Sequence, residues 1–347
     1  MKIFGRYLGY RLEKAASRML VFTILAVVLN WLVVTESIGR LNVYNNETGI
    51  YMLAIILGCL CTIVPILELS DFKNRRNLDT LYFFPIKREK MAAVHFVCGF
   101  IQVFVVYSVT FFSSWIHLAL QTHYFALEYM FFYYILSLLL GFVMYSIFAF
   151  LFIQGNTVAD GILFCVLWMF IILIVGSVVR SEILRNYIAD TKYWENSANL
   201  VTDWGIIYSP INNLTVIFQD LIEVNKHSLE YYYKSAYAAR YIREMYMFFV
   251  WGAVGIAAAI GYFITFIKKG AEKTGEISDS WFGYRLLIPL YGYSLLIFWN
   301  SEIILTALIF ALMIIGYIVY RRGFKLKSGD LIVVGCGVLA FILGIMM

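Results

Sequence analysis

The sequence predicts an all-α protein that crosses a membrane several times. Of its 347 residues, 62% are hydrophobic and 14% are charged, whereas about 25% of the residues in a typical soluble domain are charged. This number of charged residues is too small to cover the surface of a water-soluble globule. Lipid is therefore the expected solvent. In lipid the backbone must satisfy its own hydrogen bonds, which favours helices of about 20 apolar residues.

Apolar segments of this kind recur along the whole chain. The seventh is short and contains Pro289, which weakens its assignment as a span. We therefore predict six spans followed by two or three more near the C-terminus. The segments are 19–34, 48–67, 91–120, 129–153, 161–179, 245–267, 286–301, 303–320 and 331–347.

Before the first apolar segment, basic and apolar residues recur at helical spacing. This pattern predicts an amphipathic helix on the membrane surface, ahead of a first span that is retained as an anchor. The apolar members are Ile3, Phe4, Tyr7, Leu8 and Leu12, and the basic ones are Lys2, Arg6, Arg11 and Lys14.

The distribution of charge predicts the orientation. If the N-terminus is cytoplasmic, most of the 27 Lys and Arg fall in the short cytoplasmic segments, as the positive-inside rule requires. The long segment 180–244 is then external, and its tyrosines are typical of an interfacial aromatic belt. Eight spans would leave the C-terminus inside and nine would leave it outside.

The most polar cytoplasmic stretch, residues 71–90, lies between the second and third apolar segments. It is longer than a turn requires. Leu78, Leu81 and Tyr82 share one helical face and Pro85 ends the helix, so the pattern predicts a short amphipathic helix along the membrane. Such a helix can anchor the fold to anionic lipid, or it can serve as a docking element for a protein partner.

The string DTLYFFPIKR, residues 79–88, resembles the D-x-L-x-x-x-P-I-x-R segment of ABC type-2 exporter permeases. Asn77 departs from the Gly or Ser that the family often has. The resemblance implies a six-helix type-2 (type V) exporter core in residues 1–267. Residues 268–347 are then a linker and C-terminal helices, similar to a Gram-positive bacterial branch. A multi-pass protein of a bacterial cell membrane is implied.

In that family the segment forms a coupling helix that docks on a separate ATPase. The resemblance therefore implies partner ATPase subunits that carry ATP and magnesium, and a second permease copy or a paralogue. The cargo would be a peptide, a lipid-like molecule or a drug, and the external segment 180–244 would form the exit gate. The implied coupling residues are Arg75, Arg76, Asp79, Leu81, Tyr82, Phe83, Pro85 and Arg88.

Two further features suit this layout. Asn156, Thr157 and Asp160 form a tight turn before the fifth segment; the turn is either a simple helix cap or a secondary contact with the ATPase. In the sixth segment Ala253, Ala257 and Gly261 are spaced four apart, which allows close helix packing within the chain or at a subunit interface.

Other chemistry is not indicated by the sequence. No G-x-x-x-x-G-K-[ST] motif is present, so ATP hydrolysis is expected on another chain and this chain is not expected to be an enzyme. The five cysteines and four histidines lack metal-site spacing, and no nucleic-acid partner is indicated. Within the spans we expect isolated polar groups at Asn30, Gln102 and Asn300, and the sequence shows no acidic or histidine pairs at the membrane interface. The alternatives are a membrane-embedded enzyme or a regulatory membrane protein without transport.

Overall fold

The computed structural model describes residues 2–40, 47–74, 86–121, 127–178, 236–270, 272, 274–298, 303–321, 323 and 328–346. Within these ranges the chain is helical and contains no strand. Six of the helices are long and apolar enough to cross a membrane, so the chain is an all-α, multi-span membrane protein. It divides into two compact units, residues 1–153 with 209–274 (unit 1) and residues 154–208 with 275–347 (unit 2).

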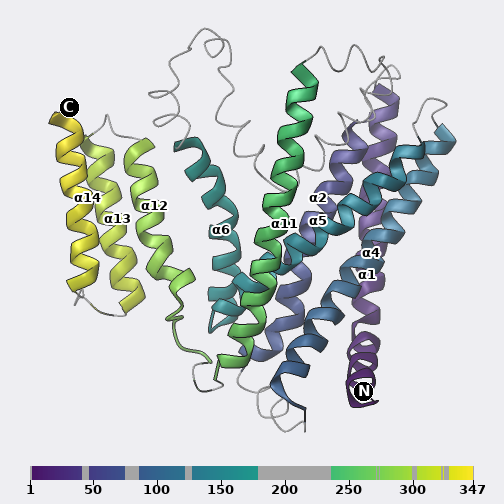
Figure 1. Ribbon diagram of the computed structural model, residues 1–347, viewed down its shortest axis with the longest axis horizontal. Coiled ribbons are helices and arrows are strands. Elements are labelled where there is room, and N and C mark those ends of the chain that lie inside the picture. Colours follow the sequence, from purple (N-terminus) through teal and green to yellow (C-terminus); the bar gives the residue numbers. More distant parts are fainter. Residues whose placement is uncertain are drawn as a thin grey trace. The chain divides into compact units, whose positions relative to one another are not determined.

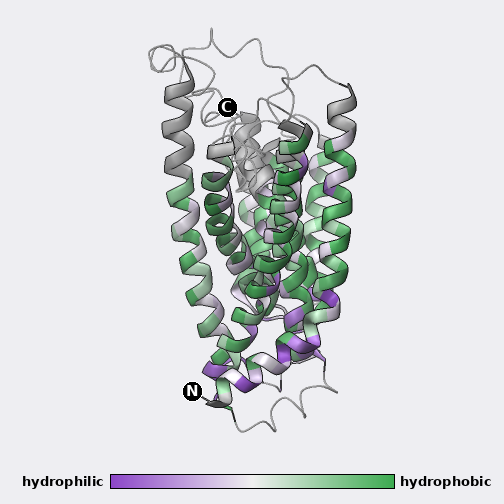
Figure 2. Ribbon diagram, turned by 90° about the vertical axis from the view of Figure 1, so that its right-hand side faces the viewer, coloured by the Kyte–Doolittle hydropathy of each residue, from purple (hydrophilic) through white to green (hydrophobic). Residues whose placement is uncertain are grey.

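Unit 1 is a bundle around the central helix α4, which contacts α1, α2 and α11 (Figure 1). Its elements are α1 Lys2–Arg40, α2 Glu47–Leu69, η1 Ser70–Lys73, α4 Arg88–Gln121, α5 Leu127–Gln154 and α11 Ala236–Lys268. The start of α1 and of α4 and the ends of α2 and α11 lie at one end of this unit, which we call the basal end. Hydrophilic residues gather at the basal end, whereas the helices above it are mostly hydrophobic (Figure 2).

The N-terminal surface helix is not a separate element, as the sequence suggested, but the first part of α1. Figure 2 shows that the turns of α1 next to the N-terminus run obliquely to the rest of the helix. Tyr7, Arg11 and Ala15 are buried at a spacing of four residues, whereas Phe4 and Leu8 are half-buried. This part of α1 therefore packs on the protein through a partly polar face.

Glycines let the helices of unit 1 approach one another. A Cβ atom at Gly255 of α11 would lie 2.8 Å from Val143 of α5, and one at Gly261 would lie 2.8 Å from Phe150. Gly261 thus packs within the chain, as one reading of the predicted small-residue stripe expects. Ala253 and Ala257 are exposed, so a subunit or lipid contact for them stays a prediction.

Unit 2 consists of α6 Val158–Val178, the π-helix η5 Trp281–Arg285, α12 Leu286–Phe298, α13 Ile303–Arg321 and α14 Ser328–Met346. The helix α12 contacts α6, α13 and α14, and Leu296, Ile309 and Met313 form a buried core. An ion pair of 3.0 Å between Arg321 and Asp330 joins the end of α13 to the start of α14.

Each of the nine predicted apolar segments is helical where the structure describes it. Pro289 is the fourth residue of α12, among the positions whose N–H groups have no partner inside a helix. With 13 residues, α12 is about 20 Å long, which is shorter than the hydrocarbon core. Of the three C-terminal helices, α13 meets the length and hydropathy expected of a span.

Candidate functional site

The candidate site is the basal end of unit 1, where the predicted coupling segment leaves and rejoins the bundle. Seven predicted coupling residues lie outside the described residues: Arg75, Arg76, Asp79, Leu81, Tyr82, Phe83 and Pro85. Both flanks of the segment are described, from Asp71 to Asn74 and from Ile86 to Arg88. The flanks show how the segment is attached to the helices.

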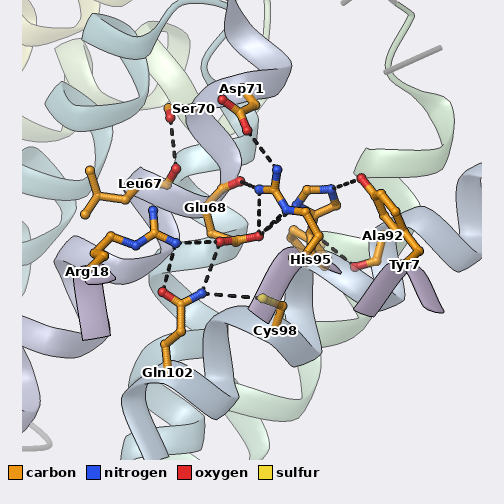
Figure 3. A network of polar contacts seen from close by, with 12 residues as sticks. Tyr7, Arg18, Leu67, Glu68, Ser70, Asp71, Ala92, His95, Cys98 and Gln102 are labelled. Carbon is orange, nitrogen blue, oxygen red and sulfur yellow. Dashed lines mark hydrogen bonds and ion pairs between the residues drawn. The ribbon is translucent and has the colours of Figure 1, made fainter. Parts of the chain in front are cut away.

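Glu68, one residue before the end of α2, is the centre of a buried polar network (Figure 3). Its Oε1 accepts hydrogen bonds from Arg11 Nε at 3.1 Å and Arg11 Nη2 at 2.8 Å, and lies 3.1 Å from His95 Nδ1. Its Oε2 accepts from Arg18 Nη2 at 2.9 Å and from Gln102 Nε2 at 3.1 Å. A carboxylate with 1% exposure is thus surrounded by donors from α1 and α4.

Arg11 extends this network to the start of the coupling segment. Its Nη1 donates to Asp71 Oδ2 at 3.0 Å, and its Nη2 also reaches the backbone carbonyl of Glu68 at 3.4 Å. Two guanidinium groups, of Arg11 and Arg18, therefore face two carboxylates, of Glu68 and Asp71. Buried charges are tolerated when they are paired and hydrogen-bonded in this way. The network ties α1 to the junction of α2 with η1.

Tyr7, His95 and Glu68 form a hydroxyl–imidazole–carboxylate chain. The Tyr7 hydroxyl lies 3.1 Å from His95 Nε2, and Glu68 Oε1 lies at the other ring nitrogen. If Glu68 is a carboxylate, Nδ1 must donate to it, which leaves Nε2 to accept from the hydroxyl; this tautomer is assigned from the network. We expected no acidic or histidine pairs at the interface, and the contact between Glu68 and His95 corrects that expectation.

Chains of this kind activate nucleophiles in enzymes. Here Tyr7 is 7% exposed and His95 is fully buried, and the carboxylate is already occupied by two arginines. A substrate could not reach the hydroxyl without separating α1 from α4. The geometry therefore supports a structural chain of hydrogen bonds.

Two lysines cap the last turn of α5. The amino group of Lys73, in η1, donates to the carbonyl of Phe152 and lies 3.8 Å from the centroid of its ring. Lys269, just after α11, donates to the carbonyl of Ile153 at 2.6 Å. The final carbonyls of a helix have no partner inside it and carry partial negative charge, so cations stabilise them. Lys73 thus joins the first flank of the coupling segment to α5.

Arg88 joins the second flank to α11. Its Nη1 lies 3.5 Å from the carbonyl of Ile267 and 3.3 Å from that of Lys269. From the sequence, we predicted that Arg88 pairs with acidic residues of a partner or with lipid phosphates. In the structure it remains exposed on the first turn of α4 while it contacts the end of α11.

The predicted secondary turn belongs to unit 2. The hydroxyl of Thr157 accepts from the backbone N–H of Asp160 at 3.0 Å, which is the helix cap that the sequence pattern predicts. Asn156 is 5% exposed and Asp160 is 8% exposed. Neither side chain is available to a partner in this arrangement.

Sequence reasoning missed the residues at the centre of the site. Glu68 follows the second apolar segment and His95 lies inside the third, and neither was predicted to be a site residue. Gln102 was expected to be isolated, although it hydrogen-bonds to Glu68 and Arg18. A usable signal existed, because opposite charges stood near the ends of adjacent apolar segments. Asn30 is buried, and neither atom of its amide has a partner among the described residues; Asn300 lies outside them.

A scan against protein-family profiles and a search of curated protein sequences each gave no match to this chain. By its fold, the chain is a multi-span helical membrane protein, and it has a buried network of ion pairs at the basal end of unit 1.

Proposed function

We propose that this chain is the membrane-spanning permease subunit of an ATP-binding cassette exporter. Separate ATPase subunits would bind ATP and magnesium, and a second permease copy or a paralogue would complete the complex. The cargo would be amphiphilic or apolar, such as a peptide, a lipid-like molecule or a drug. The resemblance of residues 79–88 to the coupling segment of such permeases motivates the proposal.

The observation that carries the proposal is the anchoring of the two flanks of that segment. The first flank contacts α1 through Asp71 and Arg11 and contacts α5 through Lys73. The second flank contacts α11 through Arg88. A partner that moved residues 75–85 would therefore act on three helices beyond the two that the segment connects. Such attachment suits a lever between a soluble motor and membrane helices.

Two alternatives have less support from the described residues. A proton-coupled carrier would need an ionisable group free to exchange protons along the pathway, whereas Glu68 is held by two arginines near the end of its helix. The chain from Tyr7 to Glu68 is the one observation that favours a membrane-embedded enzyme. Its burial argues against access by a substrate.

The test replaces Leu81 and Tyr82 with Asp in the full-length chain. The chain would be co-expressed with a candidate P-loop ATPase, and the complex would be purified into lipid nanodiscs. Each residue is predicted to contribute an apolar contact worth about 2 kcal/mol. Loss of both should abolish co-purification and reduce chain-dependent ATP hydrolysis by more than about tenfold.

Tyr10→Asp provides the matched control, because Tyr10 is 57% exposed near the start of α1 and lies outside the segment. This variant should retain both the ATPase and its activity. Full association and hydrolysis by the Leu81→Asp/Tyr82→Asp variant would show that the coupling assignment is wrong.

A further inference from the structure

Residues 275–280 follow the turn 154–157 closely, within unit 2. The backbone N–H of Gly275 donates to the carbonyl of Asn156 at 3.2 Å, and the Asn156 amide donates to the carbonyl of Ile277 at 3.3 Å. Ser278 Oγ donates to the carbonyl of Gln154 at 2.7 Å, and Ser280 Oγ donates to Gln154 Oε1 at 2.6 Å. The polar groups of the turn are thus satisfied by a distant segment of the same chain.

The contacts continue along the first turns of α6. The Tyr284 hydroxyl donates to Asp160 Oδ1 at 2.7 Å, and its ring packs edge-on against Phe164 with centroids 5.0 Å apart. Burial, together with the hydrogen bond to Asp160, raises the pKa of Tyr284. Farther along, Trp168 Nε1 donates to the carbonyl of Phe282 at 2.8 Å.

The backbone at this contact suits few residues other than glycine. Gly275 has a φ of 90°, a left-handed conformation that other residues adopt at a cost. A Cβ atom on Gly155 would lie 2.5 Å from the backbone nitrogen of Gly161. Ser278 is 1% exposed, so the segment is part of the folded core of unit 2.

A second protein could reach the turn only by displacing this segment. Displacement would break the hydrogen bonds that the segment makes with the carbonyl and side chain of Gln154, the amide of Asn156 and the carboxylate of Asp160. Each buried polar group that loses its partner costs on the order of 1–3 kcal/mol. The chain's own segment is therefore a strong competitor for the turn.

We infer that residues 275–285 are an intramolecular strap that occupies the turn 154–157 and fastens α12 to the start of α6. Through the strap, the C-terminal helices that follow it stabilise the position of the start of α6. It also excludes an ATPase subunit from the turn, so that docking falls to residues 75–85. This last consequence rests on the proposed function.

The first experiment measures how often the strap opens. Ser278→Cys and, separately, Ala159→Cys would be introduced into a full-length chain in which the two exposed cysteines, Cys59 and Cys336, are alanine. Ala159 is exposed on α6 and serves as the open reference. In membranes, a hydrophilic maleimide should label Ser278→Cys about 100-fold more slowly than Ala159→Cys, as expected of a site that opens about 1% of the time.

Tyr284→Phe removes one strap hydroxyl and should raise the labelling rate of Ser278→Cys about tenfold. Tyr293→Phe is the matched control, because the hydroxyl of Tyr293 donates to the carbonyl of Val333 in α14, away from the strap. It should leave the rate unchanged. Equal labelling of Ser278→Cys and Ala159→Cys in the otherwise unchanged chain would overturn the strap.

The second experiment adds the co-purified ATPase. It should protect Tyr82→Cys from labelling by about tenfold or more and leave Ala159→Cys and Ser278→Cys as they were. Protection of Ala159→Cys, or faster labelling of Ser278→Cys, would show that the partner takes the turn and would overturn the inference. If the ATPase does not associate at all, the proposed function is wrong. The first experiment alone then tests whether residues 275–285 occupy the turn.

Discussion

Glu68→Gln is expected to destabilise the protein by about 3–5 kcal/mol, because it leaves buried arginine charge without its carboxylate. The substitution keeps the size of the side chain and removes its charge. Arg11, at 7% exposure, would lose its closest carboxylate, and Arg18 would lose its ion pair. Chemical unfolding in detergent micelles, followed by tryptophan fluorescence and helical circular dichroism, measures the loss.

Asp71→Asn is the matched control for this prediction. Asp71 pairs with the same Arg11, but its side chain is 26% exposed, so the expected loss is below about 1 kcal/mol. A double-mutant cycle of Arg11→Met with Glu68→Gln should also show coupling, because the second change removes less once the first partner is gone. A loss below about 1 kcal/mol for Glu68→Gln would mean that the network does not hold α1 to α2.

Gly99→Ala is expected to cost about 1–3 kcal/mol through overpacking between α4 and α5. A Cβ atom at Gly99 would lie 2.1 Å from the hydroxyl oxygen of Tyr145 and 3.0 Å from the ring carbon that carries it. Tyr145 is fully buried in the bundle, so its ring has little room to move. The same unfolding measurement applies.

Removal of the hydroxyl should relieve part of this cost. The Tyr145 hydroxyl has no hydrogen-bond partner among the described residues, so Tyr145→Phe alone is expected to be nearly neutral. The double variant Gly99→Ala/Tyr145→Phe should therefore be more stable than Gly99→Ala. Gly252→Ala in α11, where nothing lies within 4 Å of the added atom, should be neutral or stabilising. Equal effects of Gly99→Ala and Gly252→Ala would contradict the packing argument.

The helices could be predicted because their signal is local. A long apolar segment in lipid has no partner for its backbone other than itself, and this holds wherever the segment lies in the bundle. The short helix α12 forms despite Pro289 because the proline falls among its first four residues. Several helices are longer than the apolar segments that predicted them. The helices α1 and α4, for example, begin with polar turns that precede the apolar segment.

The contacts of the site depend on residues far apart in the sequence. Arg11 and Glu68 are 57 positions apart, and Lys73 and Phe152 are 79 apart. Arg11 belonged to the predicted surface helix and Phe152 to the end of the fourth apolar segment, so neither position indicated its partner. The strap could not be predicted from the sequence either, because Ser278 and Gln154 are 124 positions apart. The orientation of the chain, its coupling residues 75–85 and its cargo stay predictions.

The sequence by itself determined that this protein is a multi-span helical membrane protein, where its apolar helices lie and where the polar segment 71–90 lies. Hydrophobicity and helical spacing are properties of neighbouring residues, so one chain suffices to read them. The tertiary structure alone decided that Glu68 is buried among two arginines, His95 and Gln102, and that residues 275–285 occupy the turn before α6. A buried charge is stable only beside partners that folding brings together, so its role cannot be read from its own neighbours in sequence.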